Sequence, residues 1–271
     1  MPPRKRGGGS DGAGSSRDAH DPHQVARRYP HVRFDRGTQE RDVFYHLCTR
    51  RLAPTRTFDW DLLERLGERA RTEAIVGADD STPFRRMFDA AYDTAYLELT
   101  LEFLSTFSFT PHSRDPESDI DARTHQSVHF SLFGQSFSYT LFQWATTALG
   151  FYTPEEIMAD EAGFYFHDEV GIEGPQAQAW WPRLSGQIWR DPARATQILD
   201  MVHRYIHRCI AGTIAGRGLS TERVPTPDIF FLRALIEPVR VNLAYAMALY
   251  LDGVILRPVC IQTFFKLLFI Y

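Results

Sequence analysis

The chain has 271 residues, and 44% of them are hydrophobic, which is enough for a sizeable buried core. The net charge of −4 is divided unevenly: residues 1–60 carry 12 basic and 7 acidic side chains, whereas residues 61–271 carry 18 and 27. This distribution argues against a nucleic-acid-binding surface on the body of the protein and leaves the N-terminal end as the basic region.

The three cysteines, Cys48, Cys209 and Cys260, are sparse and odd in number. Such a set argues against a disulfide scaffold and for a reducing compartment. No apolar segment follows the charged N-terminus, so we expect no secretory signal. We therefore predict an intracellular protein, in the cytoplasm or the nucleus.

Residues 1–24 are rich in Gly, Ser, Asp and Arg and contain no aliphatic run. They cannot bury enough apolar surface to become ordered, so we predict a disordered arm. Its basic cluster, Arg4, Lys5 and Arg6, is a weak candidate for nuclear localisation or for contact with the phosphates of a nucleic acid. A solvated charge cluster is the favoured interpretation, because short basic runs are common in such tails.

The next segments read as short amphipathic helices. Apolar spacing predicts one helix within residues 38–52 and another over residues 59–74, the second with Leu66 among its inward-facing leucines. Thr82 and Pro83 then supply a capping residue and a proline at an early helical position. A third helix should begin there.

The segment from Tyr96 to Phe107 has the spacing of an amphipathic helix. Its leucines and phenylalanines form a broad apolar face, and Glu98 and Glu102 lie one turn apart on what we predict to be the opposite, polar face.

A change of period after this helix predicts a β-hairpin. Apolar and polar residues alternate over residues 128–132 and 136–139, and Gly134-Gln135 is predicted to form the turn. Helical spacing resumes at Thr140, and Gly150 lies where a helix C-terminal glycine belongs. We therefore expect one short hairpin between two amphipathic helices.

The rest of the chain is predicted to be helical. Thr153-Pro154 and Thr226-Pro227 each pair a capping residue with a proline and should begin helices. Residues 175–184, 191–215 and 241–251 have apolar residues at helical spacing.

Residues 254–271 are strongly apolar but are interrupted by Arg257, Pro258 and Lys266. They are shorter than the roughly 20 residues that a membrane span needs, so we predict an atypical tail from truncation or mis-splicing and no membrane contact. Before it, residues 25–253 are expected to form one domain of mainly α (α+β) class.

His203 and His207 are the candidate metal ligands, because residues four apart share one face of a helix. Asp200 could be a third ligand, which would suit a metal-assisted hydrolase. The glutamate of the metalloprotease signature is missing between the histidines, and a pair of partly exposed helix histidines is the favoured interpretation. We therefore predict no catalytic residue, no cofactor and no small-molecule substrate.

Two other patterns are read as structural. Gly134 to Ser138 lacks the closing glycine of a nucleophile elbow, so a hairpin accounts for it better than hydrolase chemistry. Trp180 and Trp181 adjoin Arg183, and aromatic and arginine neighbours can stack on bases. The favoured interpretation is that the tryptophans belong to a helical core and its rim and do not bind nucleic acid.

Three long motifs, in this order, resemble the Athila family, the first open reading frame protein of a plant gypsy-like retrotransposon group. They are TPFRRMFDAAYDTAYLELTLEFLSTFSF at Thr82–Phe109, VHFSLFGQSFSYTLFQWATTALGFYTPEE at Val128–Glu156, and PTPDIFFLRALIEPVRVNLAYAMALYL at Pro225–Leu251. The resemblance covers roughly Tyr29 to Leu251. After Gly253 the chain departs from the family pattern.

The resemblance implies a gag-like structural protein of a mobile element, without catalytic residues, whose partners are further copies of itself and element RNA. Similarity to the plant mobile domain implies an alternative, a host-domesticated interaction module in the nucleus. The motif residues are predicted to act in packing; they are Leu101, Phe103, Leu104, Phe130, Leu132, Gly134, Trp144, Leu149, Gly150, Asn242 and Leu243.

Overall fold

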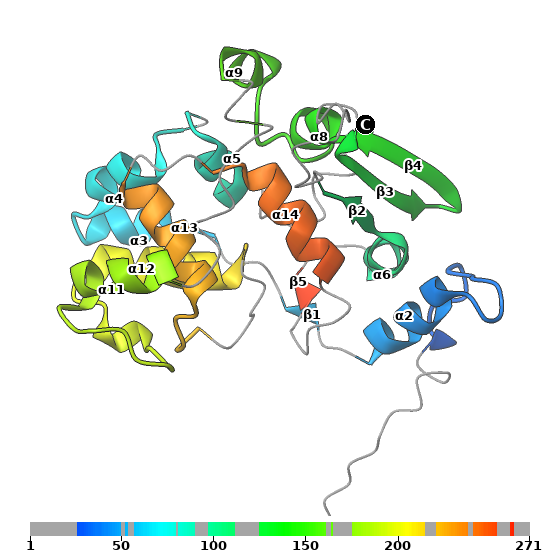
Figure 1. The fold of residues 1–271 in the computed structure, drawn as a ribbon, viewed down its shortest axis with the longest axis horizontal. Coiled ribbons are helices and arrows are strands. Elements are labelled where there is room, and N and C mark those ends of the chain that lie inside the picture. Colours follow the sequence, from blue (N-terminus) through cyan, green and yellow to red (C-terminus); the bar gives the residue numbers. More distant parts are fainter. Residues whose placement is uncertain are drawn as a thin grey trace, which may run out of the picture.

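The computed structural model describes residues 26–49, 52–53, 57–79, 81–89, 97–111, 125–160, 164, 175–214, 221–237, 241–253 and 261–262. The fold is mainly helical with a small three-stranded antiparallel sheet, which confirms the predicted α+β class. Figure 1 shows the sheet on one side of the molecule, a group of helices on the other, and helix α14 between them.

The first described helix is α2 (Gln39–Cys48), which Thr38 caps by accepting a hydrogen bond from the Arg41 amide. It packs on α6. Strand β1 (Leu52–Ala53) follows and pairs in parallel with β5 (Ile261–Gln262). The rest of the predicted tail, and all of residues 1–24, lie outside the described residues.

The single helix predicted over residues 59–74 is wrong. The structure has two helices, α3 (Trp60–Arg65) and α4 (Arg69–Val76), separated by Gly67 in a left-handed backbone conformation, φ +71°. As a result Leu66 is 54% exposed and does not face the core.

Helix α5 (Pro83–Asp89) begins as predicted, because the Thr82 hydroxyl accepts a hydrogen bond from the Arg85 amide at 3.0 Å. Helix α6 (Leu97–Thr106) follows and leads directly into β2 (Ser108–Thr110). Six consecutive residues of α6, from Thr100 to Ser105, are buried, so this helix is enclosed on more than its apolar face.

The sheet order is β2-β3-β4, with β3 (Ser127–Leu132) in the middle and β4 (Gln135–Thr140) at one edge. Strand β2 is a third strand beside the predicted hairpin. Leu132 is opposite Gln135, so the turn is Phe133-Gly134 and not Gly134-Gln135. One face of the sheet is aromatic, as in the stacked pair Phe130 and Phe137, whose ring centroids are 5.4 Å apart.

The helix predicted after the hairpin is largely a π-helix. A single turn, α8 (Leu141–Gln143), begins with a capping box between Thr140 and Gln143 and continues as a π-helix over Trp144–Ala148. The Trp144 indole N–H donates to the Ala244 carbonyl at 3.1 Å. This bond joins the hairpin unit to α14.

The second half of the chain contains α9 (Pro154–Ala159), α11 (Pro175–Ser185), α12 (Met201–Gly212), α13 (Thr226–Ile236) and α14 (Leu243–Asp252). The helix predicted over residues 191–215 begins later than expected, since only a 3-10 turn at Ala195–Gln197 precedes the Asp200 cap of α12.

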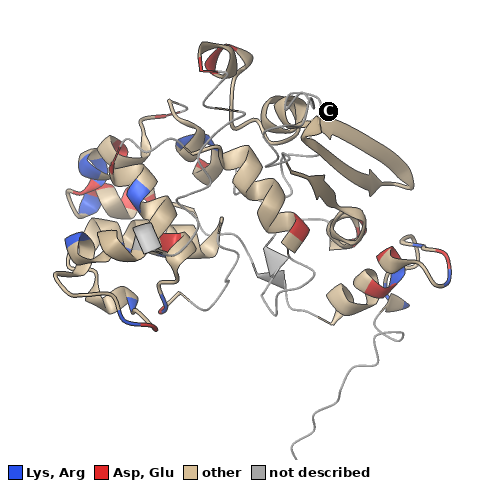
Figure 2. Ribbon diagram, viewed as in Figure 1, with Lys and Arg blue, Asp and Glu red and all other residues tan. Residues whose placement is uncertain are grey.

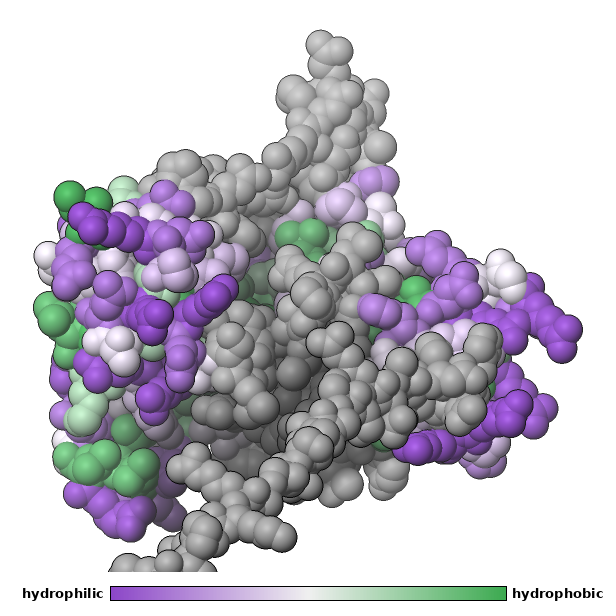
Figure 3. Space-filling model, turned by 90° about the horizontal axis from the view of Figure 1, so that it is seen from below, coloured by the Kyte–Doolittle hydropathy of each residue, from purple (hydrophilic) through white to green (hydrophobic). Residues whose placement is uncertain are grey.

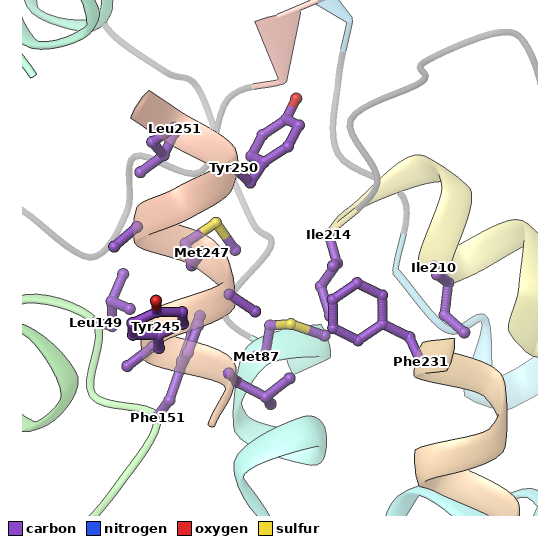
Figure 4. Packing of buried hydrophobic residues seen from close by; sticks show 14 of the residues in the cluster. Met87, Leu149, Phe151, Ile210, Ile214, Phe231, Tyr245, Met247, Tyr250 and Leu251 are labelled. Carbon is purple, nitrogen blue, oxygen red and sulfur yellow. The ribbon is translucent and has the colours of Figure 1, made fainter. Parts of the chain in front are cut away.

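Buried side chains from Val43 to Leu251 form one hydrophobic cluster. In Figure 4, Tyr245 and Met247 of α14 lie among residues of neighbouring elements, including Met87 of α5, Phe151 and Phe231 of α13. Because α14 joins the sheet side of this cluster to the helical side, the core holds the two sides together.

Candidate interaction surfaces

The tip of the hairpin is held on α6 by a buried carboxylate. Glu102 is 9% exposed, and its two oxygens accept hydrogen bonds from the amides of Phe133, at 2.9 Å, and Gly134, at 2.8 Å. Both turn residues have left-handed φ values, +54° and +72°, as a type I′ turn requires. The prediction that Glu102 lies on a polar face with Glu98 is wrong, because the hairpin covers it.

A second side chain of α6 satisfies the backbone of the central strand. The Thr106 hydroxyl accepts a hydrogen bond from the Ser131 amide at 2.8 Å, one turn along the helix from Glu102. Strand β2 begins only at Ser108, opposite His129. Next to the part of β3 that follows His129, side chains of α6 therefore take the place that a longer β2 would occupy.

The outer edge of β4, unlike the edge of β3 beside α6, has backbone groups without a partner among the described residues. In a hairpin closed by a two-residue turn, the pair next to the turn is hydrogen-bonded and bonded pairs then alternate. The amides and carbonyls of Ser136 and Ser138 consequently point away from β3. This assignment agrees with the behaviour of Ser131, which lies opposite Ser136: the Ser131 amide donates to Thr106 and not to β4. Among the residues that the structure describes, nothing bonds to these four groups of β4.

The residues of this edge offer no protection against pairing. Edge strands of monomeric proteins usually carry lysine, proline or a bulge that discourages contact with another chain. Strand β4 reads Gln-Ser-Phe-Ser-Tyr-Thr, without charge or proline, and Figure 2 shows the whole sheet free of charged residues. Phe133, at the tip, is 71% exposed. The hairpin is therefore a candidate surface for a protein partner.

A second candidate surface is a pocket of about 480 Å³ between the segment before α2 and α2 itself. Phe44 is buried and lies edge-on to Phe34, with ring centroids 5.7 Å apart, and to Tyr29, at 6.4 Å. Tyr29 and Phe34 are partly exposed. The pocket therefore combines an aromatic interior with an opening to solvent.

Four arginines line the same pocket, and none of its lining residues in the described ranges is acidic; the arginines are Arg27, Arg33, Arg36 and Arg41. Arg33 donates through Nε to the Pro30 carbonyl at 3.2 Å, and Arg41 donates through Nε and Nη2 to the Tyr45 hydroxyl at 3.1 and 3.0 Å. None of the four forms an ion pair with an acidic residue of the described ranges. Figure 3 shows this end of the molecule as largely hydrophilic, with small neutral and hydrophobic patches.

The interpretation of His203 and His207 as a pair of partly exposed helix histidines is wrong for His207. His207 is fully buried, and its Nε2 lies 2.8 Å from Oδ2 of Asp228 on α13. His203 is half-buried, and partial burial lowers the pKa of its imidazole. Asp200 caps α12 by accepting from the His203 amide. Within the described ranges no group of three or more His, Cys, Asp or Glu side chains is arranged to hold a metal ion.

Arg85, the most buried arginine of the described residues, connects neighbouring helices. The Arg85 side chain is 4% exposed and pairs with Asp79 at 2.6 Å and with Asp89. Its Cζ lies 3.8 Å from the ring centroid of Trp60, so the guanidinium joins α3 to α5. We assign it to the core and not to a site.

Trp180 and Trp181 are core residues, with 6% and 1% exposure. The Trp180 indole N–H donates to Glu237 at 2.7 Å, which ties α11 to the end of α13. The favoured structural interpretation of this pair agrees with their burial.

Most of the family-motif residues are buried; they are Leu101, Phe103, Leu104, Phe130, Leu132, Trp144, Leu149, Asn242 and Leu243. Asn242 caps α14 by accepting from the Tyr245 amide, and it donates to the Phe164 carbonyl at 2.7 Å. Gly134 and Gly150 are exposed and have φ of +72° and +65°, so they serve turns and not packing.

The basic cluster Arg4, Lys5 and Arg6 lies outside the described residues. The sequence offered that cluster as a candidate for nucleic-acid contact, with a solvated charge cluster as the favoured interpretation, and it did not point to the arginines of the pocket. A signal was present in residues 27–36, where arginines are interleaved with aromatic residues.

Comparison with protein-family models, with curated proteins and with solved structures finds no match to this chain. Among the described residues, no helix has both the length and the hydropathy to cross a membrane.

Proposed function

We propose that this chain is a non-catalytic structural protein that self-associates, of the gag-like kind encoded by Athila-type retrotransposons. The observation that carries the proposal is the outer edge of β4, where the backbone groups of Ser136 and Ser138 point away from the sheet in a strand without charge or proline. The order of the three sequence motifs supports the same role.

The proposed contact is strand addition between two copies of the chain. Two β4 strands related by a two-fold axis run antiparallel, so the same edge serves both copies and the two sheets become one. Ser136 and Ser138 would exchange backbone hydrogen bonds with the same residues of the second copy.

The hairpin is suited to this contact because it is fixed before association. Glu102 and Thr106 hold its turn and its central strand on α6, so little conformational freedom remains to be lost on binding. Phe133 would add apolar contact at the tip. Element RNA is a further proposed partner, through the arm that carries Arg4, Lys5 and Arg6.

Sedimentation equilibrium of the full chain over a series of concentrations tests the proposal. We expect an average mass that rises with concentration above the 31.1 kDa of one chain. A mass equal to one chain at every concentration would refute self-association.

A further inference from the structure

We propose that the pocket beside α2 binds a nucleotide unit of single-stranded nucleic acid, with the base against Tyr29 and Phe34 and the flanking phosphates on Arg33 and Arg36. The aromatic interior and the arginine rim carry this inference, together with a lining that holds no acidic side chain among the residues that the structure describes. It does not depend on self-association through β4, which uses a different part of the molecule.

The size and the walls of the pocket suit a planar base. Its volume of about 480 Å³ falls within the roughly 300–1,000 Å³ of small-ligand pockets. Every base has a π face that can stack on an aromatic ring, which makes such binding tolerant of sequence.

The arginines are suited to phosphates for two reasons. Arg33 and Arg41 are each oriented by a neutral oxygen, of Pro30 and of Tyr45, and their guanidinium groups retain further N–H donors. Arg27, Arg33, Arg36 and Arg41 also have no carboxylate partner among the described residues, so an incoming phosphate need not displace one.

The geometry favours a single strand over a duplex. A base can enter the pocket only when it is free of its stacked and paired neighbours, and in a duplex it is not. The partner is therefore a flexible strand whose bases can turn outward.

Fluorescence anisotropy with a labelled single-stranded oligouridylate and the full chain tests the inference. We expect the exchange of Arg33→Gln and Arg36→Gln together to weaken binding roughly tenfold at low salt and to reduce the salt dependence. Arg28→Gln together with Arg65→Gln is the matched control, because both arginines are exposed and neither lines the pocket. An equal loss in the control would overturn the assignment.

Two competitors separate the sources of affinity. Duplex RNA and inorganic polyphosphate should compete less well than the unlabelled single strand, and Phe34→Leu should weaken binding of the strand but not of polyphosphate. Equal competition by duplex RNA, polyphosphate and the unlabelled single strand would show that binding depends on charge alone, and it would overturn the role of the pocket. Because Phe34 packs on Phe44, Phe34→Leu could disturb the fold, so its circular dichroism spectrum is recorded. If Phe34→Leu is unfolded, the comparison of the arginine variants still tests the inference. Stronger competition by uridine monophosphate than by the strand would assign the pocket to free nucleotides and also contradict the inference.

Discussion

The carboxylate of Glu102 lies 2.8 Å from the backbone nitrogen of Gly134, so a residue of α6 fixes the turn of a hairpin that lies far along the chain. The same carboxylate accepts from Phe133. Since both amides belong to the turn, one side chain fixes the tip of the hairpin on α6, while Thr106 holds its central strand.

Glu102→Ala is expected to lower the free energy of unfolding by about 2–3 kcal/mol, because two amides lose a charged acceptor. Glu98→Ala, one turn earlier on the same helix, is the control and should cost less than about 0.5 kcal/mol. Urea denaturation followed by circular dichroism measures both. Equal costs would show that the turn does not depend on the carboxylate.

Phe133→Asn is expected to raise the free energy of unfolding by about 0.5–1 kcal/mol, because asparagine adopts a left-handed backbone more readily than phenylalanine. Phe133→Ala removes the same exposed ring without this gain, so it should not stabilise the protein. Thermal melts compare the three proteins. Destabilisation by asparagine would mean that the ring contributes more to folding than its 71% exposure indicates.

Sequence periodicity predicted which residues of the hairpin unit are buried but not the role of Glu102. A helical wheel places Glu102 with Glu98, and only the return of the chain 31 residues later covers one of them. The register of the turn was missed by one position because glycine suits either central position of a type I′ turn. Phenylalanine in the other position is an exception that no local rule predicts.

Helix starts were predicted where a cap is encoded locally, as at Thr82 and Thr153. The cap predicted at Thr226 is wrong, because Thr226 is the first residue of α13 after Pro225 and its side chain makes no capping hydrogen bond among the described residues. The π-helix at Trp144–Ala148 was not predicted, since it shares the sequence pattern of an α-helix. The pocket beside α2 also escaped prediction, because it arises from residues that become neighbours only when the segment folds over Phe44.

His207→Ala should lower stability by about 2–4 kcal/mol, because it leaves the Asp228 carboxylate buried without the imidazole. His203→Ala should cost less than about 1 kcal/mol, since His203 is half-buried. The melting temperature should not respond to EDTA. Equal losses that depend on zinc would instead support a metal site.

Acid should remove the stability that Glu237 contributes. The Trp180 indole N–H, together with Arg233 and Arg183, lowers the pKa of Glu237 below its ordinary value of 4.5. A carboxylate with a lowered pKa contributes to the free energy of unfolding fully above about pH 4.5, and this contribution is lost as the pH falls through the pKa of the folded state.

The stability difference between the natural protein and Glu237→Gln should therefore be only about 0.5 kcal/mol at pH 7, because solvent screens a carboxylate at the surface, and it should shrink below pH 4.5. Urea denaturation at several pH values measures it. Glu222→Gln, at an exposed position, is the control for the substitution itself. A difference that is independent of pH would show that the ionised carboxylate is not what stabilises this contact.

Self-association through β4 is tested most directly by sedimentation equilibrium of Ser138→Lys beside His129→Lys. The two residues are directly opposite each other on the exposed face of the sheet, but only Ser138 is on the edge strand. We predict that Ser138→Lys raises the dissociation constant roughly tenfold or more, and that His129→Lys changes it little. Equal association by both variants and the natural protein would contradict the proposed edge contact.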